Sequence, residues 1–357
     1  SYSSSIWLIR QDSATSVNAV GNSGTAVKIK NTDHYNTLSL SGFDWAAKYP
    51  GVAGNSLKVS YADSATFYNV TGTGTIAITY TGQVGAVTGT GTAFSTQVNV
   101  GDIIKSSDGA TIYGVVTAIA SVTSMTVLSS SASPSNVGAG AAFKYDWGYY
   151  TQFDSAPGTS TYAVNQNATN DEMHVIVIDE DGIFSGTAGT VLEKYAFVSK
   201  ASDARKNDGT VNYFKDVINN QSKYIWWGRN TTAVTGTTAW GTAASGSTFK
   251  SLTGTQTTSL AGGVDDYTDS GSYAQAGWAL FLDDTQYDIN LLMLGKATSV
   301  TANYVIQNIC EVRKDCIAFV SPQDNTSGNM ISGNGSSATT ALITYRNAIT
   351  SLSLIHI

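Results

Sequence analysis

Apolar and polar residues alternate over short stretches of this chain, a period that predicts β-strands with one buried face. The clearest alternation is Gly54–Ala62, while Met173–Asp179 is an unbroken apolar run of strand length. Val191–Ser199 and Tyr224–Trp227 predict two further strands. Ile6–Ile9 predicts a buried strand close to the start of the chain.

Two segments carry the spacing of an amphipathic helix instead. Gly209–Gln221 places Tyr213, Phe214, Val217 and Ile218 on one face. Thr301–Arg313 does the same with Tyr304, Val305, Asn308, Ile309 and Val312. The second helix lies between apolar stretches at Tyr287–Leu294 and Cys316–Val320. A strand–helix–strand unit of this length predicts a right-handed crossover between parallel strands.

The kinds of element that the sequence predicts change along the chain. Residues 1–67 mix strands with a short amphipathic piece, and residues 68–146 are short β-patterns separated by Gly and Thr turns. Residues 147–350 alternate strands with helices, with a Gly/Thr-rich stretch at 231–259 that predicts a long loop or ribbon. We therefore expect an α+β protein, a mixed α/β core with a small all-β domain, a barrel or a sandwich, at 68–146.

Within residues 68–146, strands are predicted at Thr75–Tyr80, Ile112–Ile119 and Ser124–Leu128, and a loop at Ser129–Gly140. Residues 351–357 follow a helix-like segment without capping signals, so we expect a non-native tail there and leave it out of the fold.

Composition narrows the class of protein. Charged residues are 13% of the chain, about half the usual share, and the net charge is −7. An aromatic content of 10% argues against a disordered chain. The sequence has no basic block for nucleic-acid binding and no apolar run of transmembrane length. Direct nucleic-acid contact and membrane insertion are therefore not expected.

An acidic cluster follows the strand at Met173–Asp179. Asp179–Gly182 begins like a Ca²⁺ loop, but position 5 is Ile183 and position 12 is Thr190, where acidic ligands belong. The glycines of residues 182–190 lack the spacing of a phosphate-binding loop. A β-hairpin turn is the favoured interpretation of both patterns.

Other candidates for catalysis are weak. Asp265-Asp266 and Asp283-Asp284 are paired carboxylates, but neighbouring strand residues point to opposite faces, so neither pair alone makes a glycosidase site. His34 and His174 have no nucleophile motif near them. We expect no enzyme, no catalytic or cofactor-binding residue and no cofactor.

Aromatic and sulfur-containing residues leave alternatives open. Tyr224–Trp227 is expected as a buried strand, with a sugar-binding platform as the less favoured hypothesis. Cys310 and Cys316 are expected as two buried free thiols, because free cysteine is among the most buried residue types. A disulfide between them stays possible from sequence, and no His lies near enough to suggest a metal site.

Several segments resemble the tail sheath proteins of contractile-tailed bacteriophages (myoviruses), and the run Tyr213–Ser222 (YFKDVINNQS) is the most specific. The segments are Ser3–Arg10, Gly51–Val59, Asp181–Ser199, Gly209–Ser222, Leu260–Asp266, Gly277–Leu294 and Glu311–Pro322. Residues 68–146 match none of the shared motifs.

The resemblance implies a structural protomer that polymerises into stacked six-fold rings around the tail tube. It implies contraction that drives the tube through the host envelope, with baseplate and tail terminator proteins as further partners. The expected location is the virion, after assembly in the host cytoplasm. Residues 68–146 would then be an insertion on the outer surface, residues 1–67 and 147–350 the sheath core, and both terminal arms of the family would be missing.

Two other functions remain as alternatives. A secreted or virion-associated carbohydrate-binding protein or adhesin would use the β-rich segment and the aromatic residues. A hydrolase would use a carboxylate such as Asp265 or Asp283.

Overall fold

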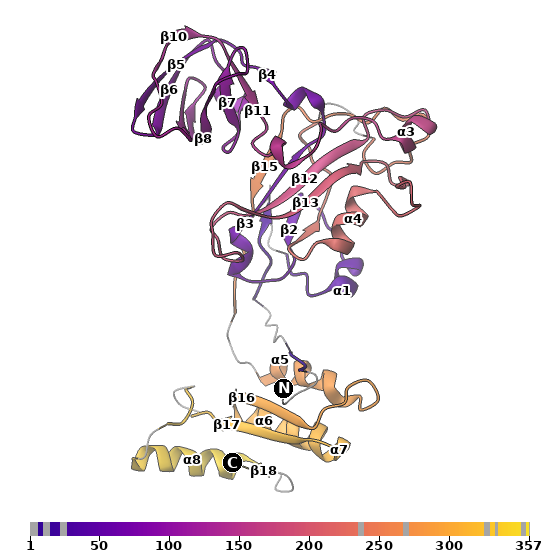
Figure 1. Cartoon of the computed structure of the whole chain (residues 1–357). Coiled ribbons are helices and arrows are strands. Elements are labelled where there is room, and N and C mark those ends of the chain that lie inside the picture. Colours follow the sequence, from indigo (N-terminus) through magenta and orange to yellow (C-terminus); the bar gives the residue numbers. More distant parts are fainter. Residues whose placement is uncertain are drawn as a thin grey trace. The chain divides into compact units, whose positions relative to one another are not determined.

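The computed structural model divides the chain into two compact units that each mix helices and strands (Figure 1). Unit 1 combines Ser1–Ser16 with Asp266–Ile357, and unit 2 is Val17–Asp265. The structure describes residues 6–9, 15–21, 27–234, 239–266, 271–324, 329–332, 335–350 and 355–356. The α+β class is confirmed. The expected boundaries after residues 67 and 146 fall inside unit 2 and stay predictions.

A four-stranded antiparallel sheet forms the centre of unit 2. β12 (Glu172–Asp179) lies between β13 (Thr190–Ser199) and β3 (Leu57–Ala62), and β15 (Gln256–Ser259) pairs with the other edge of β3. β12 is almost wholly buried, which explains its unbroken apolar run. The strands predicted at Gly54–Ala62, Met173–Asp179 and Val191–Ser199 are confirmed. β15 lies at the end of the stretch expected as a long loop or ribbon.

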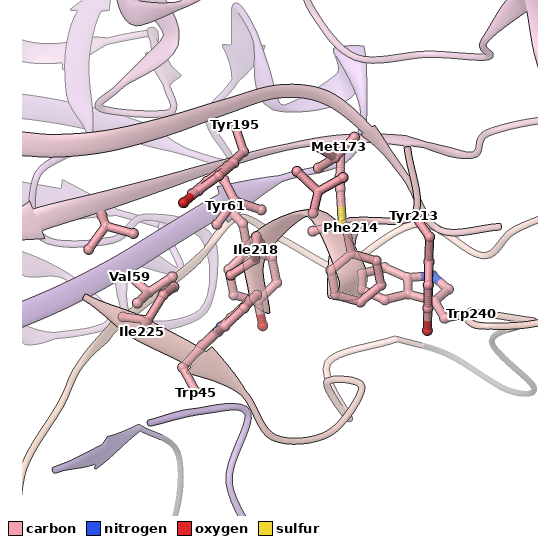
Figure 2. Packing of buried hydrophobic residues seen from close by; sticks show 14 of the residues in the cluster. Trp45, Val59, Tyr61, Met173, Tyr195, Tyr213, Phe214, Ile218, Ile225 and Trp240 are labelled. Atoms are coloured by element: carbon pink, nitrogen blue, oxygen red, sulfur yellow. The ribbon is translucent and has the colours of Figure 1, made fainter. Parts of the chain in front are cut away.

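The main core packs against this sheet around the helix α4 (Phe214–Gln221). Figure 2 shows Phe214 and Ile218 of α4 among Tyr61, Met173 and Trp240. The predicted helix is confirmed, although it begins five residues later than the pattern suggested.

A second, three-stranded sheet orders β1 (Val20–Gly21), β2 (Trp45–Ala47) and β14 (Ile225–Trp227). The strand predicted at Tyr224–Trp227 is thus confirmed. A short helix, α1 (Thr32–Thr37), was not predicted from the sequence. Asn31 caps it by accepting a hydrogen bond from the backbone N–H of His34 at 2.8 Å.

Residues 70–146 form an eight-stranded antiparallel sheet, ordered β10-β5-β6-β9-β8-β7-β11-β4. Its strands are β4 (Val70–Thr71), β5 (Thr75–Thr81), β6 (Val84–Thr90), β7 (Ile103–Ser106), β8 (Ile112–Ser121), β9 (Ser124–Leu128), β10 (Val137–Ala141) and β11 (Phe143–Asp146). The short helix α2 (Phe94–Gln97) adds Phe94 to the apolar cluster of this sheet. The predicted strands are confirmed, but the expected loop at 129–140 is wrong at its end, where β10 begins.

β4 and β11, the first and the last strand of this sheet along the chain, lie side by side. Val70 of β4 pairs with Tyr145 of β11, and the backbone N–H of Trp147 donates to the carbonyl of Phe67 at 3.1 Å. The chain therefore leaves the rest of unit 2 and returns to it at one place, as an inserted domain does.

Deleting residues 68–146 and joining Phe67 to Trp147 through a short Gly/Ser linker is expected to leave the remainder folded. Trp147 keeps its own anchor, since its indole N–H donates to Ser60 Oγ at 2.8 Å. The deletion does remove the hydrogen bonds from Asn99 to Thr255, so we expect a lower but still cooperative thermal transition. Loss of the near-UV circular dichroism signal would contradict the insertion.

Unit 1 contains the predicted parallel pair. β16 (Leu291–Ala297) and β17 (Ile317–Pro322) run parallel, joined by α6 (Ser299–Val305), the π-helical turn η5 (Ile306–Cys310) and α7 (Glu311–Arg313). The other elements of unit 1 are α5 (Gly271–Trp278), η4 (Ala279–Leu282), α8 (Ser336–Ala348) and β18 (Ile355–His356). β18, which lies in the segment expected as a non-native tail, pairs with β17.

Unit 2 also has η1 (Val52–Ser56), η2 (Ala65–Phe67), η3 (Tyr150–Gln152) and α3 (Thr161–Asn165).

Two expectations about unit 1 are wrong. Val312 is 65% exposed and Asn308 is exposed as well, because the buried face of the helix runs through Val305, Ile306, Ile309 and Cys310 and leaves these two residues outside it. Ile6–Ile9 is irregular rather than a strand, and the side chains of Ile6 and Leu8 are exposed. The strand predicted at Tyr287–Leu294 begins only at Leu291.

Candidate functional site

The acidic cluster after β12 organises a loop. Asp179 Oδ1 accepts hydrogen bonds from Ser56 Oγ at 2.7 Å and Gly182 N at 3.1 Å. Its Oδ2 accepts from Phe184 N at 2.9 Å and from Ser185 N and Oγ at 2.7 and 2.8 Å. Burial opposes ionisation, but the hydrogen bonds from Ser56 and Ser185 outweigh it and lower the pKa of Asp179 to about 2. This carboxylate is saturated by the hairpin turn that the sequence predicted.

Asp179→Asn is expected to reduce the free energy of unfolding by about 2 kcal/mol at pH 7, because an amide N–H₂ then faces backbone donors. The carboxylate contributes stability above its ordinary pKa, near 4, and that contribution disappears as the pH falls through about 2. Urea unfolding should therefore separate the variant from the parent at pH 7 and much less at pH 2. The matched control is exposed Asp181→Asn, which should stay within about 0.5 kcal/mol.

The paired carboxylates are engaged locally. Asp265, in unit 2, accepts a hydrogen bond from Val52 N at 3.0 Å. Asp283, in unit 1, accepts from Thr285 N and Gln286 N at 2.9 and 3.2 Å. Asp283 thus shapes its own turn, whereas Asp265 binds the first residue of η1 (Val52–Ser56) in unit 2.

The histidines also have structural surroundings. His174 is buried and stacked on Phe153, with ring centroids 4.1 Å apart. Its Nδ1 accepts from Phe197 N at 3.1 Å and its Nε2 lies 2.9 Å from Ser155 O, so Nε2 carries the proton. Burial lowers the pKa of His174. His34 lies in α1, where its Nδ1 accepts a long, 3.3 Å hydrogen bond from Lys30 N.

The aromatic strand β14 borders a pocket of about 440 Å³, between α1 and α4. Trp226 is buried there, stacked on Tyr35 at 4.6 Å, with Lys48 Nζ 3.3 Å from its ring centroid. Trp227 is half-buried in the pocket wall, beside Lys215 at 4.5 Å. Burial lowers the pKa of Lys48 to about 8. The buried-strand interpretation is confirmed for Trp226.

Asn219 holds this wall together. Its Oδ1 accepts from Trp227 N at 2.9 Å and its Nδ2 donates to Tyr35 Oη at 2.9 Å. Tyr35 Oη in turn donates to the carbonyl of Trp227 at 2.9 Å. The pocket is therefore a small hollow with a hydrogen-bonded wall, within the size range of ligand sites. Its walls come from three separate segments, so the sequence indicated only the aromatic run Tyr224–Trp227 and not the hollow itself.

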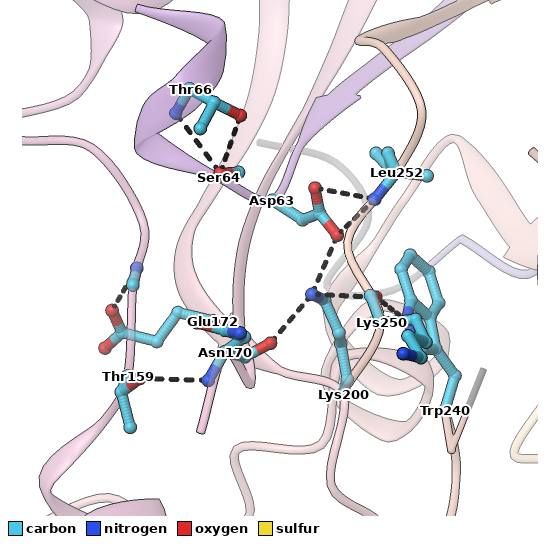
Figure 3. Close-up of polar contacts among 11 residues, drawn as sticks. Asp63, Ser64, Thr66, Thr159, Asn170, Glu172, Lys200, Trp240, Lys250 and Leu252 are labelled. Carbon is cyan, nitrogen blue, oxygen red and sulfur yellow. Dashed lines mark hydrogen bonds and ion pairs between the residues drawn. The ribbon is translucent and has the colours of Figure 1, made fainter. Parts of the chain in front are cut away.

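Unit 2 also contains an ion pair in which both side chains are buried (Figure 3). Lys200 Nζ lies 2.7 Å from Asp63 Oδ2, and both side chains have 0% exposure. Lys200 also donates to the carbonyl of Asn170 at 2.8 Å, and Leu252 N donates to both Asp63 oxygens at 3.0 and 3.1 Å. Asp63 directly follows β3, Lys200 directly follows β13, and Leu252 lies in the segment before β15. The ion pair therefore joins these three parts of the fold.

Asp102, directly before β7, is a further buried acidic group. Asp102 Oδ2 accepts from Asn99 N at 2.8 Å and Oδ1 from Gly148 N at 3.2 Å. Burial, with a smaller effect from Asp146, raises the pKa of Asp102 to about 7. Lys105 pairs with Asp146 rather than with Asp102.

We expect Asp102 to make folding less favourable as the pH rises from about 4 to about 7. The unfolded chain releases this proton near its ordinary pKa of 3.8, whereas the folded state keeps it until about pH 7. The predicted loss is on the order of 3 kcal/mol. Urea titrations of the parent and of Asp102→Asn between pH 4 and 8 measure it: the variant should start lower, since it loses one acceptor, but decline less. Parallel pH profiles would contradict the prediction.

Unit 1 exposes an apolar sheet face. Leu291 of β16 pairs with Ile317 of β17, and Met293 pairs with Phe319. Their exposed fractions run from 41% to 72%. Parallel sheets are ordinarily covered on both faces, so an uncovered apolar face of this kind is typical of a contact surface.

The described part of the chain contains no group of three or more His, Cys, Asp or Glu residues placed to hold a metal ion. No helix among the described residues is long and apolar enough to cross a membrane.

These observations describe turns, a packed core and an exposed apolar sheet face. The tail sheath protein of Salmonella phage ViI is 26% identical to this chain over 363 aligned positions, covering 92% of the chain and 50% of that relative. The chain thus spans about half the length of the relative. No family model matches. The resemblance to phage tail sheath proteins is confirmed.

Proposed function

We propose that this chain forms part of a subunit that polymerises into the contractile sheath of a phage tail. The similarity to a tail sheath protein along 92% of the chain carries the proposal. In this role the subunits form stacked six-fold rings around the tail tube, and contraction drives the tube through the host envelope. Baseplate and terminator proteins hold the two ends, and assembly takes place in the host cytoplasm before the sheath becomes part of the virion.

The contact surfaces support a structural role. The uncovered face of β16 and β17 offers apolar side chains without a charged residue among Leu291, Met293, Ile317 and Phe319. Such a face associates through burial of apolar area, which is non-directional and tolerates sliding between neighbours. The low charge of the chain fits the same role, since few ion pairs would have to break during contraction.

Residues 68–146 are proposed as a decoration on the outside of the sheath. Their eight-stranded sheet leaves and returns through the adjacent strands β4 and β11, so the core can carry it without changing its own topology. The domain contributes to the surface of the particle and leaves the subunit contacts to the rest of the chain.

Electron microscopy of the phage gene product that contains this chain tests the proposal, alone and together with the tail tube and baseplate proteins of the same phage. Tubes or stacked rings with six-fold symmetry are expected. A protein that stays monomeric at high concentration even with tube and baseplate present would overturn the proposal. Removing residues 68–146 should keep the tubes but narrow their outer diameter.

The pocket beside β14 favours one alternative, a carbohydrate-binding role in the virion. The half-buried Trp227 and the amide group of the exposed Asn220 are of the kind that contact sugars. A glycan array with the parent and Trp227→Ala decides this. Binding that the variant loses would favour an adhesin, and absence of binding would leave the sheath role alone.

A further inference from the structure

Two thiols lie together at the end of the helix of unit 1. Cys310 is the last residue of the π-helical turn η5, and Cys316 directly precedes β17. Their sulfur atoms are 3.9 Å apart, and both cysteines are free. The expectation of two buried free thiols is confirmed, but the structure also places them in contact.

The surroundings make both thiols slow to react at neutral pH. Both side chains belong to the apolar cluster that includes Phe281, Leu292 and Ile309. Burial, followed by the neighbouring sulfur of Cys316, raises the pKa of Cys310 to about 12, and burial also raises the pKa of Cys316. Since the thiolate is the reactive form, little of either cysteine reacts at neutral pH.

The turn between the two cysteines gives a route for oxidation. Lys314 adopts a left-handed conformation with φ of 65°, which costs energy in a residue other than glycine. Cys316 follows this turn and is 3% exposed, whereas Cys310 inside the helix is 0% exposed. Local opening of the turn would therefore expose Cys316 before Cys310.

We propose that Cys310 and Cys316 form a redox-sensitive pair that closes to a disulfide and ties the end of the helix to β17. The oxidant is a small-molecule disulfide, such as glutathione disulfide. The Cys316 thiolate attacks one of its sulfurs, breaks the S–S bond and releases one glutathione thiolate. The Cys310 thiolate then attacks the Cys316 sulfur of the mixed disulfide and expels the second glutathione. Two protons pass from the cysteines to the two glutathiones, and two electrons pass to the glutathione disulfide.

The consequence is a fold that tightens in an oxidising medium. A disulfide across this short loop constrains the unfolded state, and the two sulfurs already lie 3.9 Å apart in the fold. The helix α6–η5–α7 connects the parallel strands β16 and β17, so closing the bond stiffens the crossover that carries the apolar face.

Mass spectrometry of the native chain tests the proposal. The protein is incubated with glutathione disulfide at pH 8.5, free thiols are alkylated, and the chain is digested with trypsin without reduction. Trypsin cuts after Arg313 and Lys314, so a disulfide joins two otherwise separate peptides. We expect this joined pair, its loss on reduction, and a rise of about 5 °C in the melting temperature of the oxidised protein.

Single variants fix the order of the steps. Cys310→Ser should stop at a glutathione adduct on Cys316, whereas Cys316→Ser should leave Cys310 free and alkylated only after unfolding. Glutathione held on both cysteines of the parent, or a joined pair that forms only in an unfolding concentration of urea, would overturn the proposal.

Discussion

Replacing Lys200 with methionine is expected to lower the free energy of unfolding by about 3–5 kcal/mol. Asp63 would keep its two hydrogen bonds from Leu252 N but lose the ammonium that lies 2.7 Å from Oδ2. Because the carboxylate is fully buried, water cannot replace that charge. Urea unfolding followed by circular dichroism measures the loss.

The double variant Lys200→Met with Asp63→Asn separates the pair from general damage. The amide oxygen introduced by Asp63→Asn can still accept from Leu252 N, and no charge is left uncompensated, so at least half of the lost stability should return. Lys194→Met is the matched control, since Lys194 also donates to a backbone carbonyl, that of Gln152, but is exposed. A double variant as unstable as the single one would mean that packing of the lysine stem, and not charge, dominates.

The sequence predicted the elements whose burial follows a simple period. β12 lies between two strands and is buried on both faces, so its apolar run was unambiguous. The parallel pair β16 and β17 followed from the length of the helical segment between them. The local apolar pattern is sufficient to predict a strand or helix when the same kind of neighbour covers that element along its whole length.

Elements held by distant contacts were missed. α1 has only six residues, and it is kept in place by the stacking of Tyr35 on Trp226 and by hydrogen bonds to Asn219 and Trp227. Short helices have little stability of their own, so the local cap at Asn31 was not sufficient to predict this one. Val312 was placed on the wrong face because the apolar spacing alone fits two neighbouring faces of the helix, and the fold buries the one through Ile306 and Cys310.

The features of the candidate site divide in the same way, into those set by local sequence and those set by contacts between distant segments. The hairpin after β12 was predicted correctly because turn residues act locally. The Asp63–Lys200 pair, the pocket beside β14 and the Cys310–Cys316 contact depend on which segments the fold brings together. Among their residues, the two cysteines stood out in the sequence by their rarity and Tyr224–Trp227 by its aromatic run, but nothing in the sequence indicated their partners.

Replacing Val217 with aspartate is expected to destabilise unit 2 by about 4 kcal/mol or more, enough to threaten folding of this part of the chain. Val217 lies on the inner face of α4 with 4% of its side chain exposed, in the same cluster as Phe214 and Ile218. An aspartate there has no cation among the apolar side chains of that cluster, so its charge is buried unpaired or the carboxyl takes up a proton.

Asn220→Asp provides the matched control on the exposed face of the same helix, where a change within about 0.5 kcal/mol is expected. If Val217→Asp fails to give soluble protein, Val217→Ala keeps the test open, with an expected loss of about 2 kcal/mol by truncation of a buried side chain. Thermal unfolding of all three variants gives the comparison. An alanine variant as stable as the parent would mean that α4 packs loosely on the sheet, and the sequence motif Tyr213–Ser222 would then mark a surface rather than the core.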